Sequence, residues 1–215
     1  MKKILTLSVL PFLFSVSILH AQISKGSLFL GGNISGSTVK TESTQPNVTS
    51  KQNGLTISPV IGFAVKENLV FGADASYSFF KTDQVYGQYT QKQYSYGAGV
   101  FLRKYKPIGK GFYLFLQGRL GGRYDENKYT PGVSANNTKR FTTTFGGYPG
   151  VSYAINRKLQ LETGFNNLLS LNYYHETGKN LDGSGYSYKS NGFNIATSLD
   201  NLSSLYIGFR LLIGK

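Results

Sequence analysis

The stretch that decides the fold is ISPVIGFAVKENLVFGADASYSFF, residues 57–80. In both halves every second residue is apolar, and the residues between them are mostly small or polar, which is typical of β-strands. The short segment 66–68 separates the halves, so the stretch predicts a strand, a tight turn and a second strand. The apolar face of such a hairpin either covers the core of a soluble sheet or faces lipid around a barrel with a polar interior.

Composition separates these two possibilities. Charged residues make up only 15% of the chain, against roughly 25% in typical soluble domains. A soluble all-β protein would cover its outer surface with Lys, Glu and Asp, and this chain has too few of them. Glycine is abundant, at 26 of 215 residues, and cysteine is absent. The lack of cysteine excludes disulfides, zinc fingers, thiol redox chemistry and a cysteine nucleophile.

The first residues have the pattern of a secretory signal. Lys2 and Lys3 precede an apolar run that Pro11 interrupts, and a small residue, Ala21, precedes Gln22. We interpret residues 1–21 as a cleaved signal peptide and residues 22–215 as one domain; a retained helical anchor is the alternative. The net charge is +13, but the basic residues are scattered singly. Anionic lipid head groups and lipopolysaccharide are therefore better expected partners than nucleic acid.

Eight segments with a period of two follow the signal. They lie near residues 26–37, 54–65, 69–80, 92–104, 112–124, 140–155, 159–173 and 193–213. The connections alternate in length: 66–68, 105–111 and 156–158 are short, whereas 38–53, 81–91, 125–139 and 174–192 are long. The expected fold is all-β: a single eight-stranded antiparallel up-and-down transmembrane β-barrel with short periplasmic turns and longer extracellular loops.

The two faces of these segments differ in a way that favours lipid outside. Aromatic residues occur near both ends of the apolar face, as in the two interfacial girdles of a membrane barrel. The other face carries mainly glycine, serine, amides and a few charges, which suit a narrow polar interior. A soluble lipid-binding β-barrel, the alternative, would invert this arrangement. Pro59 and Pro149 lie inside segments, so we expect a bulge or a lost ladder hydrogen bond at each.

The chain resembles small eight-stranded outer-membrane β-barrel proteins of Gram-negative bacteria, including OmpX-type barrels. The resemblance rests on short pieces along the whole chain: HAQ at 20–22, KGSLFLGGNISG at 25–36, ISPVIGFAV at 57–65, GYPGVSYAIN at 147–156 and LYIGFRLLIGK at 205–215. It implies a location in the cell outer membrane and assembly by the insertion machinery of that membrane. It names an architecture and gives little about activity.

Five charged residues share the polar face of their segments: Asp74, Arg103, Arg119, Glu162 and Arg210. Glu162 and Arg210 lie at similar heights on adjacent strands, so an ion pair between them is feasible. Asp74 and Arg119 both lie at mid-depth and can join across a narrow lumen. Because eight strands leave room only for side chains, these charges predict a structural plug. An ion pathway is the alternative.

The expected loops are rich in tyrosine with small polar neighbours, a composition that suits adaptable contacts. The candidate contact residues are Tyr86, Tyr89, Tyr129, Tyr174, Tyr186 and Tyr188. His175 is the only histidine after the signal, and an esterase or acyltransferase centred on it, acting on lipid A, is the enzymatic alternative. We expect a monomeric, non-enzymatic outer-membrane protein with a structural or adhesion-like surface role, and no cofactor or metal.

Overall fold

The computed structural model describes residues 23–44, 47–84, 89–130, 136–165, 168–180, 187–197 and 205–214. These residues form ten strands: β1 (Leu28–Thr44), β2 (Asn47–Lys66), β3 (Leu69–Gln84), β4 (Tyr89–Gly109), β5 (Phe112–Tyr129), β6 (Asn136–Ala154), β7 (Leu159–Phe165), β8 (Leu169–Asn180), β9 (Ser187–Thr197) and β10 (Leu205–Ile213). Within the described residues, no helix is long and apolar enough to cross a membrane.

The ten strands build an eight-stranded antiparallel barrel. Strands β1 to β6 follow one another as a meander, and β6 then pairs with β8 along most of its length and with β7 at its end. β7 pairs with β10 and β8 with β9, so β7 and β8 together serve as the seventh wall strand, and β9 and β10 as the eighth. The all-β barrel expected from the sequence is therefore confirmed.

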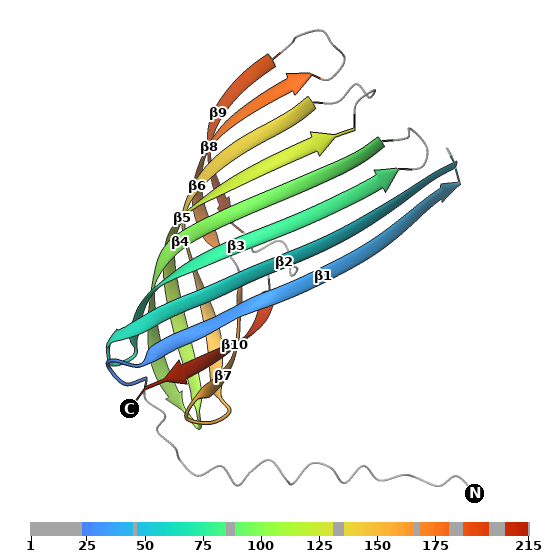
Figure 1. The fold of residues 1–215 in the computed structure, drawn as a ribbon. Coiled ribbons are helices and arrows are strands. Elements are labelled where there is room, and N and C mark those ends of the chain that lie inside the picture. The colour runs from blue at the N-terminus through green and yellow to red at the C-terminus, as the bar shows by residue number, and fades with distance from the viewer. Residues whose placement is uncertain are drawn as a thin grey trace, which may run out of the picture.

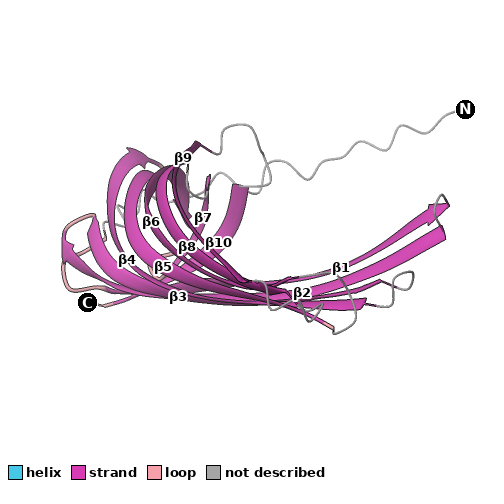
Figure 2. Cartoon of the chain, turned by 90° about the horizontal axis from the view of Figure 1, so that it is seen from above, coloured by secondary structure: helices cyan, strands magenta, loops and turns pink. Residues whose placement is uncertain are grey.

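The sheet closes on itself through β1 and β10. Residues Leu28 to Gly32 pair in register with Ile213 to Phe209. Beyond this level the described residues of β1 pair only with β2, and those of β9 only with β8. Figure 1 shows all three short turns and the C-terminal end at the bottom, here called the lower end. Seen from above, the wall curves round through β4, β5, β6 and β8, while the β1–β2 hairpin extends away (Figure 2).

Three short turns join strands at the lower end. They contain Glu67 and Asn68, Lys110 and Gly111, and residues 155–158. Asn68 and Lys110 have positive φ angles of 58° and 50°, the left-handed conformation that a two-residue hairpin turn requires. Each turn lies within or beside a connection that the sequence indicated as short, but residues 105–109 of the expected connection 105–111 belong to β4, which pairs with β5 down to Gly109. The orientation of the meander follows from these turns.

The strands are much longer at the upper end than the sequence indicated. Residues 38–53 were expected to be a loop, yet Thr38 to Thr44 pair in register with Asn53 to Asn47. The expected loops 81–91, 125–139 and 174–192 likewise contain the ends of β3 to β6, β8 and β9. Both faces of these extensions are polar, so they carry no apolar period to reveal a strand. Their Thr, Tyr and Val residues nevertheless favour extended backbone.

Pro59 and Pro149, the two prolines singled out from the sequence, occupy interruptions in the ladders. Pro59 pairs with Gly32 of β1, but towards β3 the pairing jumps from Ile57 to Val60 without a change of register. Pro149 pairs with Leu116 of β5 and lies where the other neighbour of β6 changes from β8 to β7. Because proline has no backbone N–H, each interruption removes a hydrogen bond that proline could not have donated.

Candidate functional site

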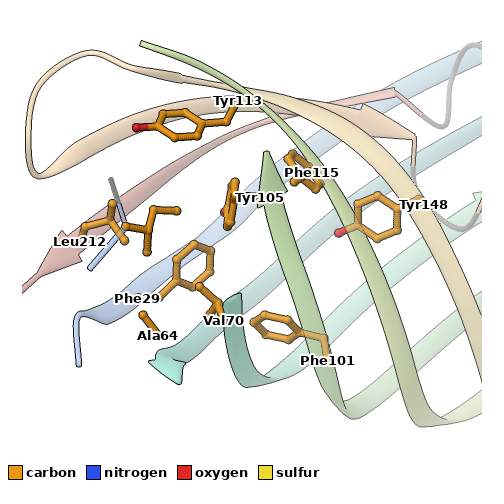
Figure 3. Close-up of a cluster of buried hydrophobic side chains, with 10 residues drawn as sticks. Phe29, Ala64, Val70, Phe101, Tyr105, Tyr113, Phe115, Tyr148 and Leu212 are labelled. Carbon is orange, nitrogen blue, oxygen red and sulfur yellow. The ribbon is translucent and has the colours of Figure 1, made fainter. Parts of the chain in front are cut away.

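The lower half of the lumen is filled by an apolar and aromatic core. Its members are all buried and project inward: Ile23, Phe29, Ala64, Val70, Phe101, Tyr105, Tyr113, Phe115, Tyr148 and Leu212. Figure 3 shows nine of them, labelled, converging from different strands. The Ile23 backbone also bonds to the turn at Asn68, whose N–H donates to the Ile23 carbonyl at 3.0 Å. The sequence predicted a polar lumen throughout, and at this end that prediction was wrong.

A buried charge cluster lies against this aromatic core. Glu162 accepts from two arginines: Arg103 Nη1 lies 2.6 Å from Oε2, and Arg210 Nη2 lies 2.6 Å from Oε1. Tyr206 donates its hydroxyl to Oε1 at 2.9 Å. The Glu162 side chain has no exposed surface, and those of Arg103 and Arg210 are 1% and 7% exposed. Glu162 offsets one of the two positive charges, so the cluster keeps a net charge of +1, and its hydrogen bonds with both arginines and with Tyr206 compensate part of the cost of burial.

Neutral side chains complete the coordination of Arg103. Its Nε donates to Gln117 Oε1 at 2.7 Å, and its Nη1 lies 3.0 Å from the hydroxyl of Tyr105. The guanidinium also lies 4.4 Å from the centre of the Phe115 ring, a cation–π contact. Arg103 is thus the centre at which the aromatic core and the charge cluster join into one plug across the lower lumen.

A second ion pair lies higher in the lumen. Arg119 donates from Nε to Asp74 Oδ2 at 2.8 Å and from Nη2 to Oδ1 at 2.6 Å, a bidentate arrangement. Both side chains are partly exposed. A Cβ added to Gly99 or Gly121 would lie only 2.6 Å or 2.5 Å from the guanidinium. The inward glycines therefore give this arginine the space it needs, in keeping with the small residues on the polar face.

All five charged residues singled out from the sequence project into the lumen. The pairs Glu162–Arg210 and Asp74–Arg119 occur as their strand positions suggested. Arg103 joins Glu162 from the far side of the barrel, a contact that strand position alone did not indicate. The aromatic and amide partners of the cluster were also missed, because period two assigns a side chain to a face but does not say which residues meet across a lumen.

The upper half of the lumen is hollow and polar. One cavity of about 480 Å³ is lined by these residues: Ser76, Gly97, Arg119, Gly121, Gly122, Arg123, Arg140, Thr142, Thr144, Ser170, Asn172, Tyr174 and Asn194. A neighbouring cavity of about 540 Å³ shares Ser76, Arg123 and Arg140 and adds Asp125 and Glu176. Six of the thirteen residues that line the first cavity are serine, threonine or asparagine and three are arginine, so this region is suited to water and small polar solutes.

The charges of the upper lumen are paired and partly exposed. Arg123 Nε lies 2.9 Å from Asp125 Oδ2. Arg140 Nε lies 2.5 Å from Glu176 Oε2, and the hydroxyl of Tyr188 donates to Glu176 Oε1 at 2.7 Å. The Tyr188 hydrogen bond, followed by Arg140, holds the pKa of Glu176 below its ordinary value. These residues fell in or near the expected loops, which is why no pairing was assigned to them.

The tyrosines proposed as loop contacts are not loop residues where the structure describes them. Tyr89, Tyr129, Tyr174 and Tyr188 lie in strands β4, β5, β8 and β9. The Tyr174 ring lies 4.9 Å from the Arg140 guanidinium, so it lines the upper lumen. Tyr86 and Tyr186 lie outside the described residues. Four of the six candidate contact residues therefore belong to the strand extensions.

His175 lies on the outward face of β8, away from the lumen. Its Nδ1 is 2.6 Å from Oδ1 of Asn191 on the paired strand β9. A side-chain amide cannot act as the general base or as the nucleophile that an acyl-transfer site requires. The described contact therefore gives the enzymatic alternative no support.

The outward face of the wall carries an uncharged band between two rows of lysine. On β5 the outward residues from Phe112 to Tyr124 are Leu, Gly or aromatic. On β4 the uncharged stretch runs from Leu102 to Tyr94, with Lys104 below it and Lys92 above. Large apolar side chains of this band are exposed on every side, including Leu116 at 63% and Ile207 at 69%. An apolar exterior combined with a polar upper lumen is opposite to the arrangement of a soluble lipid carrier.

Four chains among the solved structures match this one. The chain is similar to the crystal structure of Neisserial surface protein A (NspA), with 15% sequence identity and a TM-score of 0.41, over 87% of this chain and 99% of that chain. No protein-family model matches the chain, and no curated protein sequence is similar to it.

Proposed function

We propose that this protein is an integral outer-membrane β-barrel with a plugged lumen, which acts through strand extensions above the membrane in a structural or surface-interaction role. The observation that carries the proposal is the uncharged outward band. From Phe112 to Tyr124 the band covers about twelve residues, roughly 40 Å along the strand and roughly 30 Å in height at a tilt of about 40°. A bilayer core has a thickness of about 30 Å.

The lower plug argues for a role at the surface rather than transport. The cluster of Arg103, Glu162 and Arg210 lies buried against the aromatic core in the lower lumen. An eight-stranded barrel has an interior just wide enough for side chains. Opening a pathway would require moving charged groups that stabilise one another in a water-poor region. The polar extensions of β1 to β6, β8 and β9 are the part of the protein that remains available for contacts.

The proposal includes the route and the assembly expected from the sequence. Residues 1–21 act as a cleaved signal peptide, and residues 22–215 are inserted by the outer-membrane machinery as a monomer. The lower end, with its short turns, then lies in the periplasm, and the long extensions lie outside the cell. The soluble lipid-binding barrel and the lipid A enzyme receive no support from the described side chains.

Fractionation with gel electrophoresis tests membrane insertion. The precursor is expressed in a Gram-negative host, and outer membranes are compared boiled and unboiled in SDS. We expect outer-membrane location with a heat-dependent shift in mobility. Leu116→Arg, in the middle of the band, should reduce insertion, because a mid-bilayer arginine costs about 2–4 kcal/mol. Ser187→Arg, on the exposed end of β9, is the matched control and should insert normally. A soluble wild-type protein without a shift would contradict the proposal.

A second experiment tests the surface role. Residues 38–53 of the β1–β2 hairpin are replaced by a Gly-Ser segment of equal length, and cells displaying either form are tested on immobilised host matrix and on host cells. We expect the heat-dependent shift to remain and adhesion to fall. Equal adhesion by both forms, and by cells lacking the protein, would leave the barrel in place but overturn the adhesive role.

A further inference from the structure

Lysines occupy the outward face above the apolar band on eight strands, and we call this set the lysine collar. The collar consists of Lys40, Lys51, Lys81, Lys92, Lys128, Lys139, Lys179 and Lys189, on strands β1, β2, β3, β4, β5, β6, β8 and β9. On β3 the outward-facing residues toward the upper end are Tyr77, Phe79 and Lys81. On β5 they are Tyr124, Glu126 and Lys128. The collar therefore lies where the apolar band meets the head groups of the outer leaflet.

Several of these lysines lie directly opposite one another. Lys92 pairs in register with both Lys81 and Lys128, so three lysines stand side by side on β3, β4 and β5. Lys40 likewise pairs with Lys51. Like charges directly opposite on adjacent strands destabilise a sheet. Lys40, Lys81 and Lys128 each contact a carboxylate of the chain, from Glu42, Asp83 and Glu126 respectively. Within the described residues Lys51 and Lys92 form no ion pair, so the row keeps positive charge that an anion outside the chain can neutralise.

The densest part of the collar borders a hollow of about 520 Å³. Lys128, Lys139, Lys179 and Lys189 line it, and Glu126 is the only acidic residue among its lining. Glu126 lies 2.9 Å from Lys128 and 3.7 Å from Lys139. Its hydrogen bond raises the pKa of Lys128, which stays protonated. One carboxylate against four lysines leaves the hollow with a net charge of +3.

Two lysines of this hollow have no carboxylate partner in the described part of the chain. Lys179 and Lys189 are exposed and form no ion pair there. Lys139, Thr177 and Lys189 follow one another in register across β6, β8 and β9. The two lysines therefore lie on either side of Thr177, with roughly 10 Å between their backbones. Lys179 is the next outward residue along β8 and closes the third side of this group.

Below the hollow the wall is apolar and aromatic. Phe141, Tyr173 and Phe193 lie on β6, β8 and β9 and are 49%, 53% and 64% exposed. An occupant that satisfies both regions has acyl chains below and negative charge above. A phosphate monoester carries about −1.5 to −2 charges at pH 7, and lysine binds phosphate as a point charge. A nucleic acid or an acidic protein would use the lysines and leave the apolar wall uncovered.

We propose that the hollow on β5, β6, β8 and β9 binds the phosphate groups of an anionic glycolipid of the outer leaflet, with Lys128, Lys139, Lys179 and Lys189 as its ligands. This inference rests on the proposed outer-membrane insertion, because only insertion brings the collar to the height of the head groups. The glycolipid then acts as a counter-ion that the collar needs and lies with its chains against the aromatic residues below.

Native mass spectrometry of the detergent-purified full barrel tests the inference, with bisphosphorylated lipid A as the probe. Replacing the four lysines with glutamine should weaken retention of the lipid at least about tenfold, since each basic residue near such a surface contributes measurably. The matched control replaces Lys104, Lys106, Lys110 and Lys158 near the lower end, which removes the same charge. This control should bind like the wild type. Equal loss in both variants, or no loss in either, would overturn the site.

A single substitution gives an effect of opposite sign. Glu126→Gln releases Lys128 and Lys139 from their carboxylate and should increase retention about fivefold. A misfolded variant would bind less, so a gain cannot come from structural damage. Unchanged or weaker binding by a Glu126→Gln protein that keeps its heat-dependent mobility would contradict the site.

Two further arms separate the source of the phosphate and the underlying assumption. Inorganic phosphate at the same concentration should not displace lipid A; full displacement would mean that the hollow takes free anions, and the glycolipid proposal would be wrong. The heat-dependent mobility of each variant is recorded in parallel. A wild-type barrel that inserts but retains no lipid A overturns only this inference, whereas a wild type that fails to insert overturns the proposed function.

Discussion

The lower and upper halves of the lumen place the same chemistry in different surroundings. Below, Glu162 accepts from Arg103 and Arg210 with no exposed surface of its own. Above, Glu176 accepts from Arg140 and Tyr188, and the arginine side chain is 45% exposed. Both carboxylates hold an arginine from another strand, but only the lower one does so away from water.

The difference teaches how an eight-stranded wall divides its tasks. Large inward side chains, such as Phe29 and Phe115, fill the lower half and exclude water. Small polar ones, such as Ser76 and Thr142, leave cavities in the upper half. The lower half therefore holds the barrel together, whereas the upper half stays accessible and its ion pairs stabilise little. Substitutions at matched positions in the two halves should separate these roles.

The largest effect is expected from Glu162→Ala. The change leaves Arg103 and Arg210 buried without a carboxylate, and removing one partner from a buried ion network costs about 3–5 kcal/mol, with the upper end expected here because two cations are left. The midpoint of urea unfolding, followed by the heat-dependent mobility in SDS, measures the loss. Glu176→Gln is the matched control in the upper half and should cost at most about 1 kcal/mol. Equal costs would contradict the division between the halves.

Next in size is Phe29→Ala, which tests the aromatic core rather than its charges. Phe29 has no exposed surface and lies 6.2 Å from Phe101, ring centre to ring centre, and 5.3 Å from the Arg103 guanidinium. Removing the ring should cost about 3–4 kcal/mol, because transfer and cavity costs add. Phe71→Ala, on the outward face, should cost under about 1.5 kcal/mol. The free energies of unfolding of both variants come from the same urea titration. A larger loss of stability for Phe71→Ala than for Phe29→Ala would contradict the assignment of Phe29 to the inward face and Phe71 to the outward face.

The sequence was a good guide to the wall and a partial one to its contents. Alternation in residues 57–80 identified which side of each strand faces outward, and the inward charges such as Asp74 and Arg119 followed from it. The sequence did not indicate how far the inward side chains fill the lumen, because Tyr113 and Phe115 alternate with outward residues in the same way whether they line a cavity or fill it. A lumen contact such as Arg103 with Glu162 joins strands that are not neighbours, so no local pattern could indicate it.

The upper ends of the strands show the other limit of period-two reasoning. Thr38 to Thr44 are polar on both faces, so nothing in their order separates strand from loop. The hairpin pairing that starts lower down simply continues into them. The broken seventh wall strand was also missed, although Pro149 marks the position where β6 exchanges β8 for β7. A proline inside a strand was a signal of a ladder interruption, and it was more informative than the alternation around it.

A smaller effect is expected at the boundary between the halves. Arg119→Ala leaves Asp74 partly buried without its two hydrogen bonds, at a cost of about 1–3 kcal/mol. The apparent melting temperature of the mobility shift should fall. Conductance in planar bilayers should stay at the level of the lipid alone, because the plug around Arg103 lies below this pair. A large and stable conductance would show that Arg119, rather than the lower cluster, blocks the lumen.

The smallest effect is a local dependence on pH in the upper half. The hydrogen bond from Tyr188 and the contact with Arg140 hold the pKa of Glu176 below its ordinary value of 4.5. The unfolded chain therefore takes up this proton at a higher pH than the folded one, so the contact stabilises fully above that ordinary value and is lost as the pH falls through the lowered one.

Between pH 6 and pH 3 the NMR signals of Tyr188 and of the β8–β9 amides should shift together, with signals of the lower core unchanged. Glu176→Gln should abolish the transition. The lower core should not take part, because a solvent-exposed ion pair contributes too little energy to unfold a plug that excludes water. A transition shared by the lower core would contradict this expectation and would mean that the two halves respond as one unit.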